Sequence, residues 1–210
     1  PTWLDAMREL QDALPEQSAF ERRRCIELIG YTLFYRPLPL RWAYGSPLRR
    51  ALKRGDLVGA IGDHFPLEVP LHRMGGWRQG VGASAARRLP PFLDERRACA
   101  LSRVERLRAI PGVQVHADRS GERGTWPILL VRLDSERRRD AVLGRLWTAG
   151  LGVSRMFIHA LPGYLGLRDI VPRQHCPNAA DLAARSLTIT NSPWLRDSDF
   201  EAICRVIEAS

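Results

Sequence analysis

Residues Ile128-Leu129-Leu130-Val131 form a short, uninterrupted apolar run in the second half of this 210-residue chain. A polar, glycine-containing stretch over 118–125 precedes the run, which is typical of a strand buried on both faces. The following residues, 135–149, carry apolar side chains at helical spacing, and Gly150 supplies a left-handed stop. A buried strand followed at once by a helix predicts a layered α/β unit.

The pattern on either side of this pair extends the same unit. Alternating or apolar runs predict further strands over 113–116, 151–157 and 187–190. A short helix is expected over 178–185, and Ser198 with Glu201 predicts a capping box for the last helix. The second half therefore predicts a compact two-layer fold of the α/β (α+β) class.

The first half is different, because helices dominate it. Thr2 and Asp5 predict a capped first helix, and further helices are expected over 18–34, 47–54 and 75–107. Pro90 and Pro91 predict a kink or restart inside the last of these, and the stretch from Gly55 to Pro70 is expected to be a loop. We therefore expect a helical segment over 1–70 that completes a larger domain, a connecting helix over 71–110 and a small α/β domain over 111–210.

Arginine supplies almost all of the positive charge, with 31 arginines against one lysine, Lys53, and a net charge of +9. Such a charge fits a nucleic-acid partner, small anions such as nucleotide diphosphates, or arginine-rich helix faces in water. The basic doublets and triplets are spread along the chain, beside acidic residues and without a nucleic-acid-binding motif. We expect solvated helix faces, and nucleic acid is the less favoured partner.

Several other patterns exclude classes of protein. The four cysteines show no C-x-x-C spacing, so buried reduced thiols are expected and no metal site is predicted. No apolar run reaches the ~20 residues that span a bilayer, and no signal-peptide pattern opens the chain, so a cytoplasmic protein without a membrane partner is expected. The chain begins at Pro1, which fits both a removed methionine and a longer parent chain. Four tryptophans are expected in the core: Trp77, Trp126, Trp147 and Trp194.

Two segments resemble parts of one family. Arg73-Met74-Gly75-Gly76-Trp77-Arg78-Gln79-Gly80-Val81-Gly82 is similar to the Arg-Met helix start of DegT/DnrJ/StrS sugar aminotransferases. The stretch from Cys176 to Thr190 resembles the closing pattern of the same family, and the intervening strands and helix occur in the family's order. The resemblance covers roughly residues 70–208 and implies the small C-terminal domain of a fold-type-I aminotransferase.

The resemblance implies a function and a set of site residues. It implies an enzyme that depends on pyridoxal phosphate (PLP), uses glutamate and a nucleotide-linked keto sugar as substrates, and forms a homodimer. Arg73 is the implied cofactor contact, and the implied substrate contacts are His72, Arg155, His159 and Tyr164. In this family the cofactor lysine lies in the large domain, upstream of these segments. Lys53 lies at a predicted helix end without that context, so we expect no catalytic residue in this chain.

Three departures from the family pattern keep a second interpretation open. Leu71 stands where the family has a phosphate-contacting Asn, and Arg78 replaces a Gln. The stretch from Met156 to Pro162 replaces the family's His-Tyr-Pro-x-Pro-Leu-His substrate loop, so only His159 remains of it. The alternative is a non-catalytic binding or dimerisation module that keeps the small-domain fold.

Overall fold

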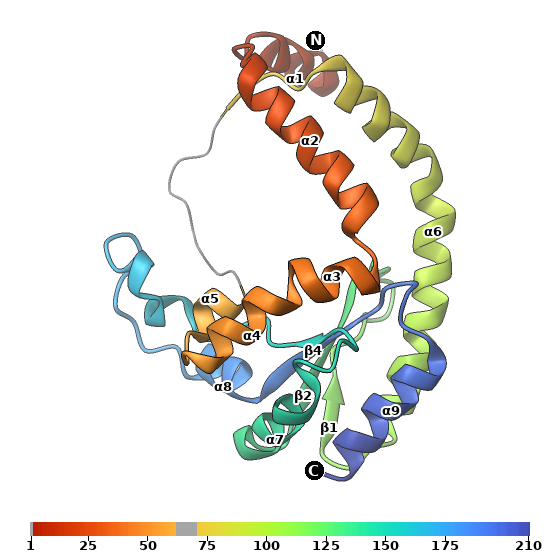
Figure 1. Ribbon diagram of the computed structural model, residues 1–210, viewed down its shortest axis with the longest axis vertical. Coiled ribbons are helices and arrows are strands. Elements are labelled where there is room, and N and C mark those ends of the chain that lie inside the picture. The colour runs from red at the N-terminus through yellow and green to blue at the C-terminus, as the bar shows by residue number, and fades with distance from the viewer. Residues whose placement is uncertain (1, 62–70) are drawn as a thin grey trace. The chain divides into compact units, whose positions relative to one another are not determined.

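The computed structural model describes residues 2–61 and 71–210, which form two compact units. Unit 1 contains residues 2–36 and 71–91, and unit 2 contains residues 37–61 and 92–210. The helix α6 (Gly76–Arg108) runs through the boundary between the units (Figure 1). Pro90 and Pro91 lie inside α6, which continues past them without a break. Each unit has its own internal contacts. The domain boundaries expected at residues 70 and 110 remain a prediction.

Unit 1 begins with two helices, and the start of the first and both ends of the second were predicted correctly. Helix α1 (Trp3–Asp12) starts with a complete capping box, in which Thr2 N–H donates to Oδ2 of Asp5 across 2.9 Å. Helix α2 (Ser18–Phe34) ends before Pro37, as the loss of a backbone N–H at proline dictates. Local sequence signals therefore determine both helices.

Unit 1 buries no apolar side chain among its described residues. On α1, Trp3 and Leu10 are 79% and 70% exposed, and on α2 the apolar residues Ile29 and Leu33 are exposed as well. Trp77, predicted as core, is 52% exposed. Within the described part of the unit, no surface covers the apolar faces of these helices.

Unit 2 is built on a four-stranded antiparallel sheet with the strand order β1-β2-β4-β3. Its strands are β1 (Val113–Val115), β2 (Ile128–Leu133), β3 (Val153–Ser154) and β4 (Ser186–Thr190). The central pair places Leu129 opposite Ile189 and Val131 opposite Leu187. The predicted strand over 151–157 is shorter than expected, because only two of its residues pair with β4.

Helices cover one face of this sheet. Leu129, Val131 and Leu133 of β2 pack with apolar residues of α6, α7 (Glu136–Leu146) and α9 (Asp197–Glu208), which lie beside the strands in Figure 1. The alternate residues of β2, including Arg132, are only half-buried on the opposite face, beside α8 (Pro177–Arg185). The expectation that β2 is buried on both faces is therefore wrong, because an antiparallel sheet can leave one face to water. The two-layer α/β fold itself is confirmed.

Three short helices precede the sheet within unit 2: α3 (Pro37–Ala43), α4 (Gly45–Lys53) and α5 (Leu57–Ile61). The prediction of α4 is confirmed, whereas α3 was missed and α5 lies in the expected loop. The rest of that expected loop, 62–70, lies outside the described residues. Leu48 and Ala51 of α4 pack with Ala60 of α5 and against Trp147, so these helices form a small second core.

Four further expectations need correction. The last helix is not capped by Ser198, because it begins at Asp197 and its N-cap Arg196 makes no side-chain cap. Trp194 is 53% exposed rather than buried. Arg139, predicted on a solvated face, is 1% exposed and contacts Glu136, Asp140 and the Ala183 carbonyl. Of the four cysteines only Cys204 is buried, and the other three are half-buried free thiols.

The helix predicted over 135–149 is present but shorter, because α7 ends at Leu146. Ser135 Oγ accepts a hydrogen bond from the Arg138 N–H and so caps α7, and Gly150 has the predicted left-handed backbone, with φ of 79°. Over the part of the chain that the structure describes, no helix is both long and apolar enough to cross a bilayer.

Candidate functional site

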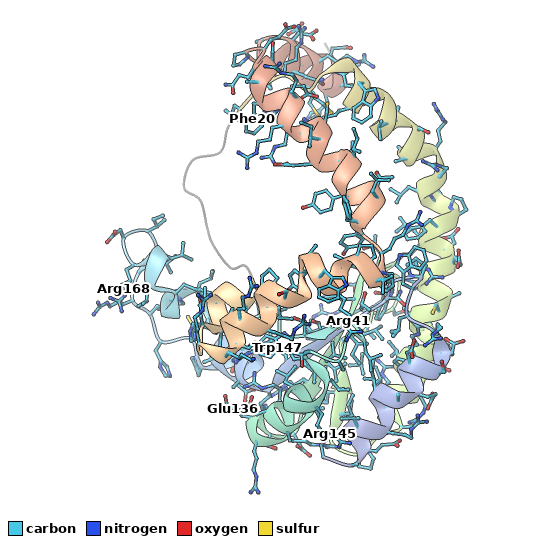
Figure 2. The ribbon with its side chains drawn as sticks, viewed as in Figure 1. Phe20, Arg41, Glu136, Arg145, Trp147 and Arg168 are labelled. Carbon is cyan, nitrogen blue, oxygen red and sulfur yellow. The ribbon has the colours of Figure 1, made fainter. Side chains whose placement is uncertain are left out.

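The Glu21 carboxylate is the centre of a charged cluster in unit 1. Nη1 of Arg78 donates to Oε2 of Glu21 across 2.8 Å, and Nε2 of His72 lies 3.5 Å from the same oxygen. The His72 ring packs edge-on against Phe20, with the ring centroids 4.4 Å apart (Figure 2 labels Phe20). The predicted substrate residue His72 is therefore held by α2, and its side chain is 12% exposed.

The charges in this cluster shift the protonation of Glu21. Partial burial pushes the pKa of the Glu21 carboxyl upward, but the hydrogen bond and positive charge of Arg78 outweigh it, together with the Gly75 N–H and His72. The pKa of Glu21 is therefore lowered. Glu21 is an ionised anchor, and its chemistry is that of a charge partner rather than of a proton donor.

Arg73, the predicted cofactor contact, is engaged by carboxylates at both ends of its guanidinium. Nη2 donates to Oδ1 of Asp12 across 2.7 Å, and Nη1 donates to Oε1 of Glu16 across 3.1 Å. These two hydrogen bonds raise the pKa of Arg73. Asp12 and Glu16 are 69% and 75% exposed, so the pairs are surface ion pairs of the kind that contributes little to stability.

A hollow of about 330 Å³ lies beside this cluster. Its lining contains Glu16, Glu21, Arg73, Gly75 and Gln79, with four neighbouring residues. Among the described residues of the lining, the sole guanidinium is that of Arg73, which is paired with two carboxylates. A phosphate dianion there would meet Glu16 and Glu21 as like charges. The described residues of this hollow therefore do not fit the phosphate group of PLP.

Gly75 explains part of the glycine-rich sequence after Arg73. A Cβ added at Gly75 would lie 2.8 Å from Oε1 and 2.9 Å from Cγ of Glu21. The backbone approaches the carboxylate so closely that only glycine fits without a shift. The Gly75-Gly76 pair is thus a packing and helix-start feature at this site.

Arg155, predicted to contact substrate, anchors a loop in unit 2. Its Nε donates to the Phe157 carbonyl and its Nη2 to the carbonyls of Ile158 and Ala183, at 3.0 to 3.2 Å. Burial, followed by the neighbouring charge of Arg139, lowers the pKa of Arg155. Because the guanidinium donates these hydrogen bonds to backbone oxygens, the role that the structure shows for Arg155 is to position the loop after β3.

His159 and Tyr164 belong to the same loop. The rings lie edge to face with centroids 5.5 Å apart, and the Tyr164 hydroxyl accepts a hydrogen bond from the Ile158 N–H across 3.3 Å. Tyr164 is buried and His159 is exposed. The structure thus brings Arg155, His159 and Tyr164 together, while His72 and Arg73 form a separate cluster in the other unit.

Lys53 lies at the end of α4 and is exposed. Lys53 does not line the hollow of about 330 Å³ beside Arg73, nor a second hollow that lies on the sheet of unit 2. Among the described residues, no group of three or more His, Cys, Asp or Glu side chains is placed to hold a metal ion.

Sequence reasoning missed a larger hollow of about 590 Å³ on the open face of the sheet. Arg132 of β2 lies in its lining; its guanidinium donates to Gln114 across 3.2 Å and to Oδ2 of Asp181 across 2.5 Å. Arg185 donates to the same carboxylate oxygen across 2.5 Å. The only sequence signal was a charged residue directly after the apolar run of β2, and the partners of Arg132 on other elements could not be derived from it.

Known proteins share this fold and these motifs. Residues 72–208 match the DegT/DnrJ/EryC1/StrS aminotransferase family. The match covers well over half of the chain, which therefore belongs to that family. Aminotransferases of this family depend on PLP.

Two solved structures support the assignment of the fold. The aminotransferase TlmJ from Streptoalloteichus hindustanus is 25% identical, with a TM-score of 0.50 over 61% of this chain and 34% of its own. DesV from S. venezuelae, solved in complex with a ketimine intermediate, is 15% identical, with a TM-score of 0.55 over 75% of this chain and 43% of its own. The chain spans less than half the length of these relatives.

Proposed function

We propose that this chain is the C-terminal part of a PLP-dependent aminotransferase that transfers an amino group from glutamate to a nucleotide-linked keto sugar. The observation that carries the proposal is the family match over residues 72–208, combined with a chain that spans 34% to 43% of the solved relatives. In this proposal the cofactor lysine belongs to the part of the enzyme that this chain does not contain. Amine chemistry on a carbonyl needs a lysine, and arginine cannot replace it.

The position of Lys53 supports the proposal that the cofactor lysine lies outside this chain. A lysine that holds a cofactor needs a concave, partly desolvated site, which favours the neutral amine. Lys53 is instead exposed at a helix end, outside the lining of both hollows. We therefore assign it no catalytic role.

The exposed apolar faces of unit 1 also support the proposal. Trp3, Leu10 and Ile26 are each at least 70% exposed, and large exposed apolar groups mark surfaces that another element covers. We propose that α1 and α2 complete the larger domain of the enzyme. A homodimer and a cytoplasmic location follow from the same family-based proposal.

Arg73 has a conditional role in this proposal. Its exposed partners Asp12 and Glu16 hold it only through surface ion pairs, so a better anionic partner from the rest of the enzyme could take their place. His72, Arg155, His159 and Tyr164 remain the proposed substrate-side residues. Arg155 would act by holding the loop that carries the other two residues of its group.

One observation favours a second candidate, a non-catalytic binding or dimerisation module. Arg73 is neutralised by two carboxylates, and Leu71 supplies no polar contact where the family has an asparagine. In this alternative the small-domain fold is kept, and no cofactor is bound even when the rest of the family's architecture is supplied.

The deciding experiment compares the chain with a longer product that includes the coding region upstream. Each protein is incubated with PLP, reduced with borohydride and examined by peptide mass spectrometry for a pyridoxyl group on lysine. The proposal expects the group in the longer protein, on a lysine upstream of Pro1, together with glutamate-dependent amination of a nucleotide keto sugar. Specific labelling of Lys53, lost in K53A but not in a heat-denatured control, would overturn the proposal. A longer protein without PLP binding would favour the module.

A further inference from the structure

Helices α3 and α4 of unit 2 combine exposed apolar side chains with several basic residues and no acidic residue among them. Residues 37–55 contain five basic residues and no acidic one: Arg41, Arg49, Arg50, Lys53 and Arg54. None of the five forms an ion pair with a residue that the structure describes. Elsewhere in unit 2 many arginines are paired, as Arg97 is with Asp118 and Arg106 with Glu201. This segment also lies outside residues 72–208, so the family match does not account for it.

The two helices share one helical phase. Tyr44 N–H donates to the Leu40 carbonyl and Leu48 N–H to the Tyr44 carbonyl, so hydrogen bonds between residues four apart continue across the junction. Figure 1 shows α3 and α4 running end to end. With 3.6 residues per turn, Leu38, Trp42, Arg49 and Lys53 fall along one face.

This face points away from the core of unit 2. The opposite side of α4 is fixed by Leu48 and Ala51, which are 7% and 5% exposed. On the outer side Leu38 and Trp42 are 73% and 71% exposed. Arg41, labelled in Figure 2, lies one position before Trp42 and is exposed as well. The helix pair is therefore anchored on one side and presents aliphatic, indole and cationic groups on the other.

The chemistry of this outer face selects its partner. An interface with an apolar protein surface would bury several cations without partners, which costs free energy. Nucleic acid would pair with the cations but would leave Leu38 and Trp42 in water. The interfacial region of an anionic bilayer satisfies both, since Trp and Leu enter the headgroup boundary while Arg and Lys reach the phosphates.

We propose that the face of Leu38, Trp42, Arg49 and Lys53, flanked on its two sides by the exposed Arg41 and Arg50, binds the surface of membranes that contain anionic phospholipids. Such binding lies in the plane of the interface and needs no helix that spans the bilayer. The expectation that the protein has no membrane partner stays a prediction, and this proposal is the alternative to it. The inference does not depend on the proposed aminotransferase activity, because it uses none of the residues assigned to that activity.

The test is co-sedimentation of the chain with vesicles of phosphatidylcholine alone and of phosphatidylcholine with an equal share of phosphatidylserine. Binding is expected only to the anionic vesicles and should weaken as salt shortens the Debye length from ~10 Å at 0.1 M to ~3 Å at 1 M. R50Q/K53Q should weaken binding by about fivefold for each charge removed, or about 30-fold together. The matched control is R137Q/R145Q, which removes two exposed charges from α7 and should leave binding unchanged.

A second measurement keeps the apolar part of the proposal testable. Brominated acyl chains should quench part of the tryptophan fluorescence of the bound chain, and W42S should abolish that quenching. W194S, which removes another half-exposed indole of unit 2, should not. Equal losses in the α7 control, no binding to anionic vesicles, or quenching that persists in W42S would each overturn the proposal. DNA binding that R50Q/K53Q weakens, without vesicle binding, would assign the face to nucleic acid instead.

Discussion

Arg103 of α6 donates a hydrogen bond from Nη1 to Oδ1 of Asn191, across 3.2 Å, in the interior of unit 2. The same Asn191 amide donates to the carbonyls of Arg96 and Trp126 at 2.8 and 2.9 Å. Both side chains are more than 95% buried. One asparagine thus connects α6, the approach to β2 and the end of β4, and it satisfies three polar groups that water cannot reach.

Replacement of Asn191 should therefore be costly. N191A leaves the buried Arg103 guanidinium and two carbonyls with fewer partners, so we expect the free energy of unfolding to fall by about 2–4 kcal/mol. Asn178 is exposed on α8, and N178A should change it by less than about 0.5 kcal/mol. Urea unfolding followed by circular dichroism measures both, and equal effects would contradict the role given to Asn191.

A second prediction concerns the close contact of Gly75 with Glu21. G75A places a methyl group 2.8 Å from Oε1 of Glu21, which should push the carboxylate away from Arg78 and His72. Hydrogen exchange over residues 72–79 should become faster. The matched control is G80A, because nothing lies within 4 Å of a Cβ at that helical position. G80A should stabilise α6 by roughly 0.5–1 kcal/mol, since alanine favours helix over glycine.

The third prediction is a pH dependence in unit 1. The folded-state pKa of Glu21 is lowered below 4.5, its ordinary value. A carboxyl with a lowered pKa contributes stability that is fully present above the unfolded value and is lost as the pH falls through the folded value. The contribution of Glu21 should therefore disappear below about pH 4.5 and not between pH 5 and 8.

Carboxyl-carbon NMR titration of Glu21 checks this prediction. R78Q should raise the pKa of Glu21, because it removes the strongest interaction that favours the charged form. Arg22 is an exposed neighbour of Glu21 on α2, and R22Q is the control. Identical titration curves for R78Q and the unaltered chain would contradict the geometry of this cluster.

The fourth prediction concerns thiol reactivity. Cys204 is buried in the core of unit 2, and burial raises its pKa to about 11. Its thiolate is therefore scarce at neutral pH, and access is blocked as well. Iodoacetamide should label Cys25, Cys99 and Cys176 of the native chain first and reach Cys204 only when unit 2 unfolds. Peptide mass spectrometry over time measures the order, and early labelling of Cys204 would contradict it.

The sequence by itself determined those features that depend on a few neighbouring residues. The Thr2–Asp5 capping box, the end of α2 and the left-handed backbone of Gly150 are local hydrogen-bonding or backbone preferences, and all are as predicted. The order of strands and helices in the small unit was also predictable, because hydrophobic periodicity is a local signal. The family resemblance followed from motifs of the same local kind.

Only the tertiary structure decided which side chains are buried and which are paired. Arg139 lies in a basic triplet, a pattern that predicts a solvated helix face. In the structure it is only 1% exposed, and its guanidinium donates a hydrogen bond to the Ala183 carbonyl of α8. Trp77 and Trp194 are large and apolar, yet the described residues of their own units leave each of them about half exposed. Likewise, Arg73 finds Asp12 and Glu16 some sixty positions earlier in the sequence. Burial and ion pairing depend on contacts between distant segments, and a pattern within one segment carries no information about its partners.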